Sequence, residues 1–461
     1  MKKRPNILIL MSDEHRADVA GFAGDPVART PTLDWLAQDG FVFNNAYTPS
    51  PICVPARQCI FSGQYPQTNR CTGWIGLPPG HMTYATRCGQ YGYRTAGFGK
   101  MHLIGPDQLA GWQTRPVGDV AFGGVKDPIE SFFDGFDAPQ DDTLNCPGSM
   151  KWSDEKEIRR AGPGADNPHD VHAVDGALFW IDETFVGSRY DRHIPQRPSL
   201  LYIGTHDPHY PYQCREDLFR YYLPRVRGYE VEAPFDHPFL GLSPWPPTPL
   251  QAGVHVPQRD VQRARAAYYG KVETMDAHFG RILDALRFVG EDLDEWIIVY
   301  LSDHGDQMGE HGVWEKQKFF EGSARVPFII RAPKLLPQGK SVDANVNLVD
   351  LFATLCDLAG MEAPAGLDSR SLVPLMHGDN SDWDDETCSF FLQQGFRNIM
   401  VKRGALKFQY YEHEEKGIMP EVLFDLKADP RETRNAVDDP RHSAAVAALR
   451  ARTAALRESL L

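Results

Sequence analysis

Cys53 begins the pentapeptide Cys53-Val-Pro-Ala-Arg57, in which a proline follows the cysteine by two residues and an arginine by four. A second proline, Pro51, precedes it by two residues. Because proline restricts the backbone, the thiol lies in a stiff segment. Such a cysteine is either a reactive nucleophile or a buried cysteine in a turn. The pentapeptide alone allows both, so the interpretation depends on the other polar motifs of the chain.

Two pairs of adjacent residues, Asp13-Glu14 and Asp303-His304, each follow an apolar run, and we call them the acidic pairs because each begins with an aspartate. Carboxylates at the end of a buried strand are costly unless a cation or water neutralises them. A solvated loop explains the first pair taken alone, and helix capping explains many pairs like the second. Two such pairs in one sheet favour a shared divalent metal, and these ligands suit Ca²⁺, Mn²⁺ or Mg²⁺. Zinc is less favoured because no set of three His or Cys ligands is apparent.

Lys100 and His102 follow a third apolar run, in Gly99-Lys-Met-His102. Two residues apart in an extended segment, they are expected to face the same side. Lys100 would then hold an anionic oxygen and His102 would move a proton. Taken alone, a surface lysine and a hydrogen-bonded histidine explain the pair equally well.

Two further motifs carry cationic or proton-transferring side chains. His206 and His209 lie in a proline-rich loop after a fourth apolar run, and spacing does not choose between them or exclude a structural turn. Lys316 or Lys318 can reach an anion, whereas Arg325, which precedes Val-Pro, is expected to be structural.

These side chains need a scaffold, and the chain alternates short apolar runs with helical patterns. The predicted strands are Asn6–Met11, Arg94–Phe98, Ser199–Gly204, Trp296–Leu301 and Pro327–Ile330. The predicted helices are Thr32–Asp39, Thr83–Tyr91 and Val261–Phe288. This alternation predicts an α/β fold with a large, mostly parallel sheet flanked by helices. Ligands bind beyond the C-terminal strand ends of such sheets, which is where both acidic pairs are expected.

The composition excludes several classes of partner. The chain has 461 residues and a net charge of -14, and its basic residues do not cluster, so neither nucleic acid nor an anionic membrane is expected to bind. The apolar run near the N-terminus is too short for a signal peptide and soon meets two carboxylates. The eight cysteines form no CxxC pair, which favours free thiols and a cytoplasmic location.

The pattern changes near residue 380. Before it, residues 133–170 and 229–257 are irregular and are expected to be surface insertions that shape the substrate entrance or an oligomer contact. After it come four short antiparallel strand patterns and a helical pattern over residues 438–461. We therefore predict a catalytic α/β domain over residues 1–379 and a smaller C-terminal α+β subdomain over residues 380–461. The strand patterns are Cys388–Gln393, Ile399–Lys402, Lys407–Tyr411 and Val422–Asp425.

Taken in order, these motifs resemble those of the formylglycine-dependent sulfatases of the alkaline phosphatase superfamily. The resemblance spans about residues 5–335 and continues in a C-terminal segment, Leu423-Phe-Asp-Leu-Lys-Ala-Asp-Pro-Arg. It implies an alkaline-phosphatase-like fold and hydrolysis of sulfate monoesters, as in arylsulfatases. The motifs are Asp13-Glu14, Cys53-x-Pro-Ala-Arg57, Gly99-Lys-Met-His102, His209, Asp303-His304, Lys316, Glu321-Gly and Arg325-Val-Pro.

The resemblance also implies a role for each site residue. Cys53 would be converted to formylglycine by a separate formylglycine-generating enzyme, and Arg57 would steady the hydrated aldehyde. Lys100 would contact the sulfuryl oxygens, His102 would accept a proton, and His209 and Lys316 would stabilise or protonate the leaving oxygen. One divalent metal ion would be bound by Asp13, Glu14, Cys53 in its modified form, Asp303 and His304.

Two departures from the family pattern keep other substrates open. The first acidic pair is Asp13-Glu14 where Asp-Asp is typical, and Ala56 follows the proline, as in phosphonate monoester hydrolases. The ion is therefore predicted to be Ca²⁺ or Mn²⁺, with sulfate, phosphonate or phosphodiester substrates. The stretch Gly99-Lys-Met-His-Leu-Ile-Gly-Pro-Asp-Gln-Leu-Ala-Gly-Trp112 also resembles the corresponding stretch of choline sulfatases. Family relatives further imply a small anionic ester as substrate and a homo-oligomer.

Overall fold

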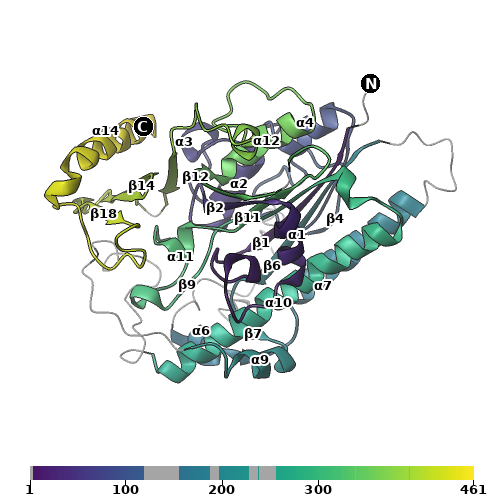
Figure 1. Cartoon of the computed structure of the whole chain (residues 1–461), viewed down its shortest axis with the longest axis horizontal. Coiled ribbons are helices and arrows are strands. Elements are labelled where there is room, and N and C mark those ends of the chain that lie inside the picture. Colours follow the sequence, from purple (N-terminus) through teal and green to yellow (C-terminus); the bar gives the residue numbers. More distant parts are fainter. Residues whose placement is uncertain are drawn as a thin grey trace, which may run out of the picture.

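The structure is a computed structural model that describes residues 4–118, 155–186, 197–227, 237, 256–337, 339–393 and 395–460. It confirms the α/β class: one large sheet is flanked by helices, and a small antiparallel sheet lies toward the C-terminus (Figure 1). Parts of both predicted insertions, residues 133–154 and most of 229–255, lie outside the described residues. Within the first insertion, residues 155–170 are more regular than expected, because they contain α6, β5 and the start of α7.

The large sheet has the strand order β12-β2-β11-β8-β1-β6-β3-β4. All neighbouring pairs are parallel except those of β11, which runs antiparallel to both β2 and β8. Its strands are β1 Asn6–Asp13, β2 Phe41–Tyr47, β3 Arg94–Gly99, β4 Thr114–Gly118, β6 Ser199–Pro208, β8 Trp296–Ser302, β11 Phe328–Arg331 and β12 Ser341–Asn347.

Both faces of this sheet are buried, and β1 shows why its sequence is a continuous apolar run. Leu8 and Leu10 point into the core formed with α1, α7 and α10, whereas Ile7 and Ile9 point into the core formed with α2, α4 and α12. A strand covered on both sides has no position for a polar side chain until it ends. The helices are α1 Pro31–Asp39, α2 Cys53–Ser62, α3 Pro66–Asn69, α4 Tyr84–Gln90, α6 Glu155–Arg160, α7 Pro168–Ile181, α9 Glu216–Tyr222, α10 Gln258–Phe288, α11 Glu321–Ala324, α12 Leu351–Leu358, α13 Val373–Met376 and α14 Ser443–Ser459.

The C-terminal sheet has the order β13-β14-β15-β18, and all its pairs are antiparallel, as predicted. Helix α14 covers one face of it, and the other face packs on aromatic side chains of the catalytic part, among them Phe319 and Phe320. The domain boundary at residue 380 stays a prediction. The strands are β13 Glu386–Phe391, β14 Asn398–Arg403, β15 Leu406–Tyr410 and β18 Val422–Asp425; the two-residue strands elsewhere are β5 Gly162–Pro163, β7 Gln213–Cys214, β9 Gln307–Met308, β10 Trp314–Glu315, β16 Glu412–His413 and β17 Gly417–Ile418.

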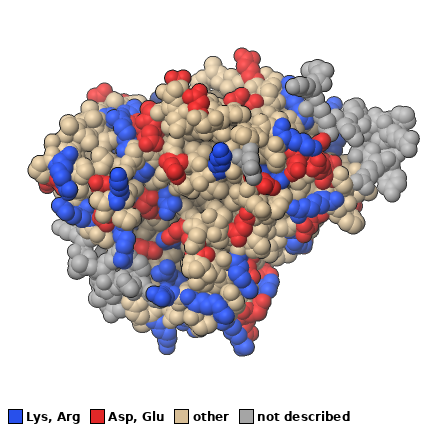
Figure 2. Space-filling view, in the orientation of Figure 1, with Lys and Arg blue, Asp and Glu red and all other residues tan. Residues whose placement is uncertain are grey.

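Charge and hydropathy of the described residues give two further observations. On the face drawn in Figure 2, lysine and arginine side chains are interspersed with aspartate and glutamate. Of the helices in the described ranges, none combines the length and the apolar character that a membrane span requires. The seven cysteines in these ranges are all buried free thiols, as predicted; Cys146 lies outside them.

Candidate active site

Four neighbouring strands of the large sheet, β8, β1, β6 and β3, direct their C-terminal ends to one place. Asp13 ends β1, and Asp303 follows β8, which pairs with β1 in register up to Ser12 and Ser302. On the other side of β1, strand β6 contains His206 near its end and is followed by His209, and Lys100 follows β3. The expected gathering of polar residues at this sheet edge is therefore confirmed.

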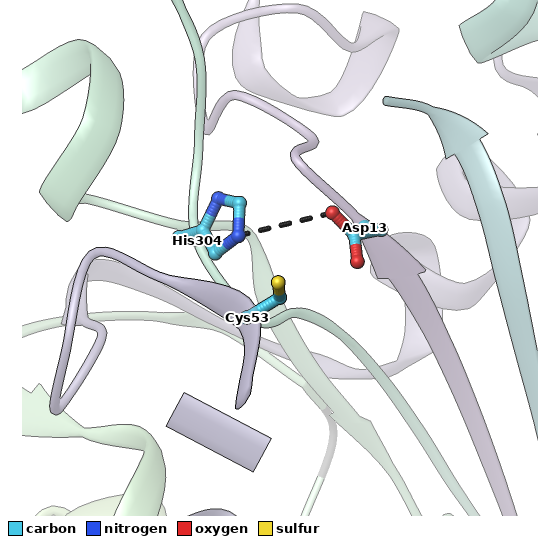
Figure 3. A group of neighbouring side chains, drawn as sticks. All are labelled: Asp13, Cys53 and His304. Atoms are coloured by element: carbon cyan, nitrogen blue, oxygen red, sulfur yellow. Dashed lines mark ion pairs between the residues drawn. The ribbon is translucent and has the colours of Figure 1, made fainter. Parts of the chain in front are cut away.

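Asp13, Cys53 and His304 form a group that can hold a metal ion. One ligand atom of each residue lies within 4.8 Å of the others, and all three residues are buried. Figure 3 shows the Cys53 thiol and the His304 imidazole turned toward the Asp13 carboxylate, with His304 Nε2 3.8 Å from Asp13 Oδ1. A second such group joins Asp13 with Glu14 and His209. Both groups share Asp13.

Several buried polar atoms of this site have no hydrogen-bond partner among the described residues. They are Asp13 Oδ1, Glu14 Oε1 and His304 Nε2. Burying such atoms without a partner costs free energy, because water no longer solvates them. Asp13 and His304 belong to one candidate group and Glu14 to the other, and carboxylate oxygens with an imidazole nitrogen fit a hard or borderline divalent cation. The residues present therefore fit the metal that the sequence predicted.

Asp303 has a different set of partners. Its Oδ1 accepts hydrogen bonds from the backbone amides of Glu14 and His304, at 3.2 and 2.9 Å, and its Oδ2 faces Arg57 Nε at 2.7 Å. It is absent from both candidate ligand groups of the described residues, although His304 Nε2 is only 3.8 Å from its Oδ1. In this structure Asp303 connects the two acidic motifs.

The turn at Glu14 explains how two adjacent acidic side chains enter one site. Glu14 has φ +68, a left-handed conformation that is unusual for a residue with a Cβ. Tyr268 of α10 supports this turn, because its hydroxyl donates to the Glu14 carbonyl at 2.7 Å and accepts from the Arg16 amide at 2.9 Å. Burial raises the pKa of Glu14 well above its usual range, and nearby Lys316 offsets this only in part.

Arg57 is fully buried and orients the acidic residues. Its guanidinium bonds Asp303 Oδ2 and Asp13 Oδ2 and donates to the carbonyls of Ser12 and Lys100. The burial that would raise the pKa of Asp13 is outweighed by Lys100, His209 and Arg57, so this pKa lies well below its usual range. Lys100, His209 and Arg57 together lower the pKa of Asp13, and Arg57 also bonds both Asp13 and Asp303.

Cys53 is the first residue of α2, whose N-terminal dipole end favours negative charge at this position. The segment before it is fixed by the Pro51 carbonyl, which accepts from the Gln317 amide at 2.8 Å. Burial nevertheless raises the pKa of the Cys53 thiol to about 11, although Lys316 and Lys100 act in the opposite direction. The encoded thiol is therefore neutral near pH 7 and is a poor nucleophile in that form.

The structure brings both histidines of the proline-rich loop to the site. Predicted His209 lies 3.4 Å from Glu14 Oε2 and 2.5 Å from Lys316 Nζ. His206 was left open by its spacing, and its Nδ1 lies 3.3 Å from Lys100 Nζ. Lys100 Nζ in turn is 2.7 Å from Asp13 Oδ2. His206 is thus a site residue that the sequence did not single out, because an identical His-x-Pro pattern surrounds both histidines.

Of the two lysines left open, Lys316 is the one that contacts the acidic group. Its Nζ lies 3.3 Å from Glu14 Oε2, and Lys316 is 1% exposed. Burial would lower the pKa of Lys316, but Glu14 and other anionic neighbours raise it well above its usual range. Burial lowers the pKa of Lys318 to about 7. Arg325 pairs with Glu321 at 2.9 Å, which agrees with the structural role expected for it.

The expected geometry of His102 was wrong. Strand β3 ends at Gly99, and φ values of +78 at Gly99 and +50 at His102 turn the chain, so the two-residue alternation does not extend from Lys100 to His102. The half-buried His102 ring lies 5.6 Å from the Trp74 ring, and its carbonyl accepts from Gln58 Nε2 at 2.7 Å. His102 therefore meets the helix of Cys53 through Gln58.

Sequence comparison connects this geometry to known proteins. The profile of the sulfatase family matches residues 5–361, which include every site residue described above. The chain belongs to the sulfatase family. A second profile, described as the C-terminal part of N-sulphoglucosamine sulphohydrolase, matches residues 309–459 of this sulfatase.

Individual relatives cover nearly the whole chain. A choline-sulfatase of Rhizobium meliloti is 30% identical over 95% of this chain and 83% of its own. An arylsulfatase of Clostridium perfringens is 28% identical over 97% of this chain and 93% of its own. The crystal structure of the phosphonate monoester hydrolase of Agrobacterium radiobacter superposes with a TM-score of 0.77 at 23% identity, covering 99% of this chain and 96% of the other. The structural likeness establishes the fold, and the sulfatase profile with its sulfatase relatives supports a sulfuric ester hydrolase.

Proposed function

We propose that this sulfatase cleaves sulfate monoesters of aryl or small alkyl alcohols with an oxygen nucleophile at position 53. The observation that supports it most strongly is the grouping of Cys53 with Asp13 and His304. Asp13, its neighbour Glu14 and His304 each bury a polar atom that has no hydrogen-bond partner among the described residues. A thiol nucleophile alone would leave these buried polar atoms without a partner, whereas a bound cation would satisfy them. In the proposal Cys53 is oxidised to formylglycine by a separate maturation enzyme.

Two groups absent from the encoded chain complete the chemistry. The hydrate of formylglycine offers one hydroxyl for attack on sulfur and a second that allows the aldehyde to re-form, which a serine could not do. A Ca²⁺ or Mn²⁺ ion held by Asp13, Glu14 and His304, with Asp303 beside them, would lower the pKa of the attacking hydroxyl.

The side chains of the chain itself supply the remaining electrostatics. Lys100 binds the sulfuryl oxygens from the side of β3, and His206 and Asp13 fix its ammonium. Lys316 and His209, 2.5 Å apart, meet the leaving oxygen, so negative charge that develops there is stabilised and then protonated. By its resemblance to the family, His102 would accept the proton of the second hydroxyl while sulfate leaves through cleavage of the C–O bond. Arg57 orients Asp13 and Asp303 throughout.

Mass spectrometry of the peptide that contains Cys53, combined with activity measurements, tests the nucleophile. We expect the peptide to lose sulfur and gain an aldehyde or its hydrate, in proportion to specific activity across preparations. Fully active enzyme with unmodified cysteine would contradict the proposal.

A phosphonate monoester or phosphodiester hydrolase with the same nucleophile is the second candidate. Glu14 and Ala56 favour it, because the family's phosphonate monoester hydrolases also depart from the Asp-Asp pattern and also have alanine after the proline. In addition, both substrates place an anionic tetrahedral centre against the same cations. Comparing kcat/KM for p-nitrophenyl sulfate and for a phenyl phosphonate monoester decides between them. The sulfate ester is expected to be the better substrate, with measurable activity on the other; the reverse order would favour the second candidate.

The identity of the alcohol is a separate question. An alkyl sulfate such as choline-O-sulfate is kept as an alternative because a relative is named a choline-sulfatase. Adding choline-O-sulfate as a competitor of p-nitrophenyl sulfate hydrolysis tests it, and inhibition with a constant in the micromolar range would favour the alkyl substrate.

A further inference from the structure

The segment that carries Lys316 continues directly into the contact with the C-terminal sheet. Within this segment Glu315 and Gln317 have φ values of +63 and +70, and both residues are buried. Left-handed residues with a Cβ persist only where their surroundings fix them. One fixed point is the Gln317 amide, which bonds the Pro51 carbonyl beside Cys53. The other end of the segment is Glu321, the first residue of α11.

Glu321 is held by two residues of the C-terminal part. Lys407 of β15 pairs with Glu321 Oε1 at 2.8 Å and also with Glu432. The Glu321 amide donates to Glu432 Oε2 at 2.6 Å, so Glu432 caps α11 from another part of the chain. Lys407 is 0% exposed and Glu432 2%. We call Glu321, Lys407 and Glu432 the anchor cluster.

The rest of the contact makes the anchor cluster rigid. The Tyr47 hydroxyl donates to Glu321 Oε1 at 2.8 Å, and Arg325 holds the other carboxylate oxygen at 2.9 Å. Phe319 and Phe320 lie between Lys316 and Glu321 and are buried in an apolar core with side chains of β14 and β18. Removing one member of a buried charge group leaves the others uncompensated, so the cluster tolerates little change.

We propose that Lys407, together with Glu432, is a positioning residue for Lys316. The C-terminal part thereby completes the active site without contributing a catalytic residue to it. Lys407 fixes Glu321, Glu321 fixes the end of the segment, and the segment places the Lys316 ammonium against Glu14 and His209. This inference rests on the proposed function, in which Lys316 stabilises the leaving oxygen.

Leaving-group dependence tests the inference, because misplacing Lys316 penalises poor leaving groups more than good ones. The variant is Lys407→Met, assayed with phenyl sulfate and p-nitrophenyl sulfate. We expect kcat for phenyl sulfate to fall by roughly tenfold more than kcat for p-nitrophenyl sulfate. A variant that is only partly folded loses the same fraction of activity on both substrates, so equal losses would overturn the inference.

Lys402→Met is the matched control. Lys402 lies opposite Lys407 on the adjacent strand β14 and is 3% exposed. Its ammonium hydrogen-bonds Asn345 and the Gly404 carbonyl, so it acts on Glu321 through its charge and not through a hydrogen bond. It is expected to lower stability without changing the ratio of the two rates. A change of that ratio as large as in Lys407→Met would contradict the inference, because any buried charge in this sheet would then serve equally.

Two further variants separate the possible failures. Lys316→Ala should give the largest change in the ratio of kcat for phenyl sulfate to kcat for p-nitrophenyl sulfate. If this ratio stays at the wild-type value, the role of Lys316 in the proposed function fails. If it changes the ratio and Lys407→Met does not, only the positioning inference fails. Should Lys407→Met not fold, Glu432→Gln decides, because its amide oxygen still accepts from the Glu321 amide while the charge is lost. A smaller change of the ratio in the same direction is expected, and an unchanged ratio counts against the inference.

Discussion

Asp13 and Asp276 are both buried aspartates, but only Asp276 has hydrogen-bond partners for both of its carboxylate oxygens among the described residues. Asp276 lies in α10, and its two oxygens accept the backbone amides of Thr32 and Leu33 at 3.0 and 2.9 Å. It supplies the cap that α1 lacks locally, since the Thr30 side chain makes no capping bond. Asp13 uses Oδ2 for Lys100 and Arg57 and leaves Oδ1 without a partner among the described residues.

The comparison teaches that burial alone does not identify a functional carboxylate. Both oxygens of Asp276 have partners within the protein, because an unmet acceptor would cost stability. Asp13 instead has one oxygen without a hydrogen-bond partner among the described residues, which a ligand can use. The same criterion distinguishes the Glu14 oxygen near the candidate metal group from the Glu321 carboxylate, both of whose oxygens are bound.

The largest expected effect concerns the nucleophile. Cys53→Ala should lower kcat/KM for p-nitrophenyl sulfate by at least about 10⁴-fold, because no oxygen or sulfur remains at position 53 to attack the ester. Cys59→Ala is the matched control, since Cys59 is a buried thiol of the same helix. It should stay within a few-fold of the wild type. Comparable losses in both variants would mean that α2 tolerates no truncation at all.

Metal binding tests the comparison of the two aspartates directly. Removing divalent ions with a chelator should abolish activity, and adding Mn²⁺ or Ca²⁺ at about 100 times its Kd should stabilise the folded enzyme by about 2.7 kcal/mol. In Asp13→Asn this metal-induced rise in Tm should largely disappear. Asp276→Asn should start from a different Tm but keep the full rise. A full rise in Asp13→Asn would exclude that residue as a ligand.

The pH dependence of stability should report Asp276. Burial raises the pKa of Asp276 to about 7, above about 3.8 in the unfolded chain, so the folded state holds this proton more tightly. Its contribution is fully present below about pH 3.8 and is lost as the pH rises through 7, a change on the order of 4 kcal/mol. The free energy of unfolding, measured with urea, should therefore fall less in Asp276→Asn than in the wild type as the pH rises from 4 to 8. Parallel pH profiles would contradict this.

The smallest effect is expected for an exposed ion pair. Arg450 of α14 faces Glu421 through both carboxylate oxygens, and its side chain is 55% exposed. Solvent screens such pairs, so Arg450→Gln should change the free energy of unfolding by less than about 1 kcal/mol and leave kcat unchanged. A larger loss would show that this pair holds α14 on the sheet more strongly than its exposure suggests.

Much of the fold was predictable because buried strands and amphipathic helices have local signatures. The five strands and three helices predicted before residue 380 and the four strands and one helix predicted after it all exist, with ends displaced by a few residues. Strands β2 and β12 were not predicted. In both, polar side chains interrupt the apolar pattern, at Asn44-Asn45 in β2 and at Asp343 in β12. Asn44 Nδ2 donates to Asp343 Oδ1 at 2.7 Å, so these residues pair with each other across the two strands.

The sequence by itself determined which side chains end the buried strands, because a strand covered on both faces admits charge only where it stops. That is why the apolar runs alone were enough to place Asp13, Lys100 and Asp303 at one edge of the sheet. The sequence also specified the pentapeptide on which the proposed reaction depends. No local pattern could specify contacts between distant segments.

The tertiary structure alone decided how those segments meet. Glu14 and Lys316 are 302 residues apart, and only the folded chain sets their separation at 3.3 Å. The same holds for His206 beside Lys100, for Arg57 between two aspartates and for Lys407 behind Glu321. The physical reason is common to all four: a buried charge is stable only with its partner, and the partner is supplied by packing, which local sequence does not record.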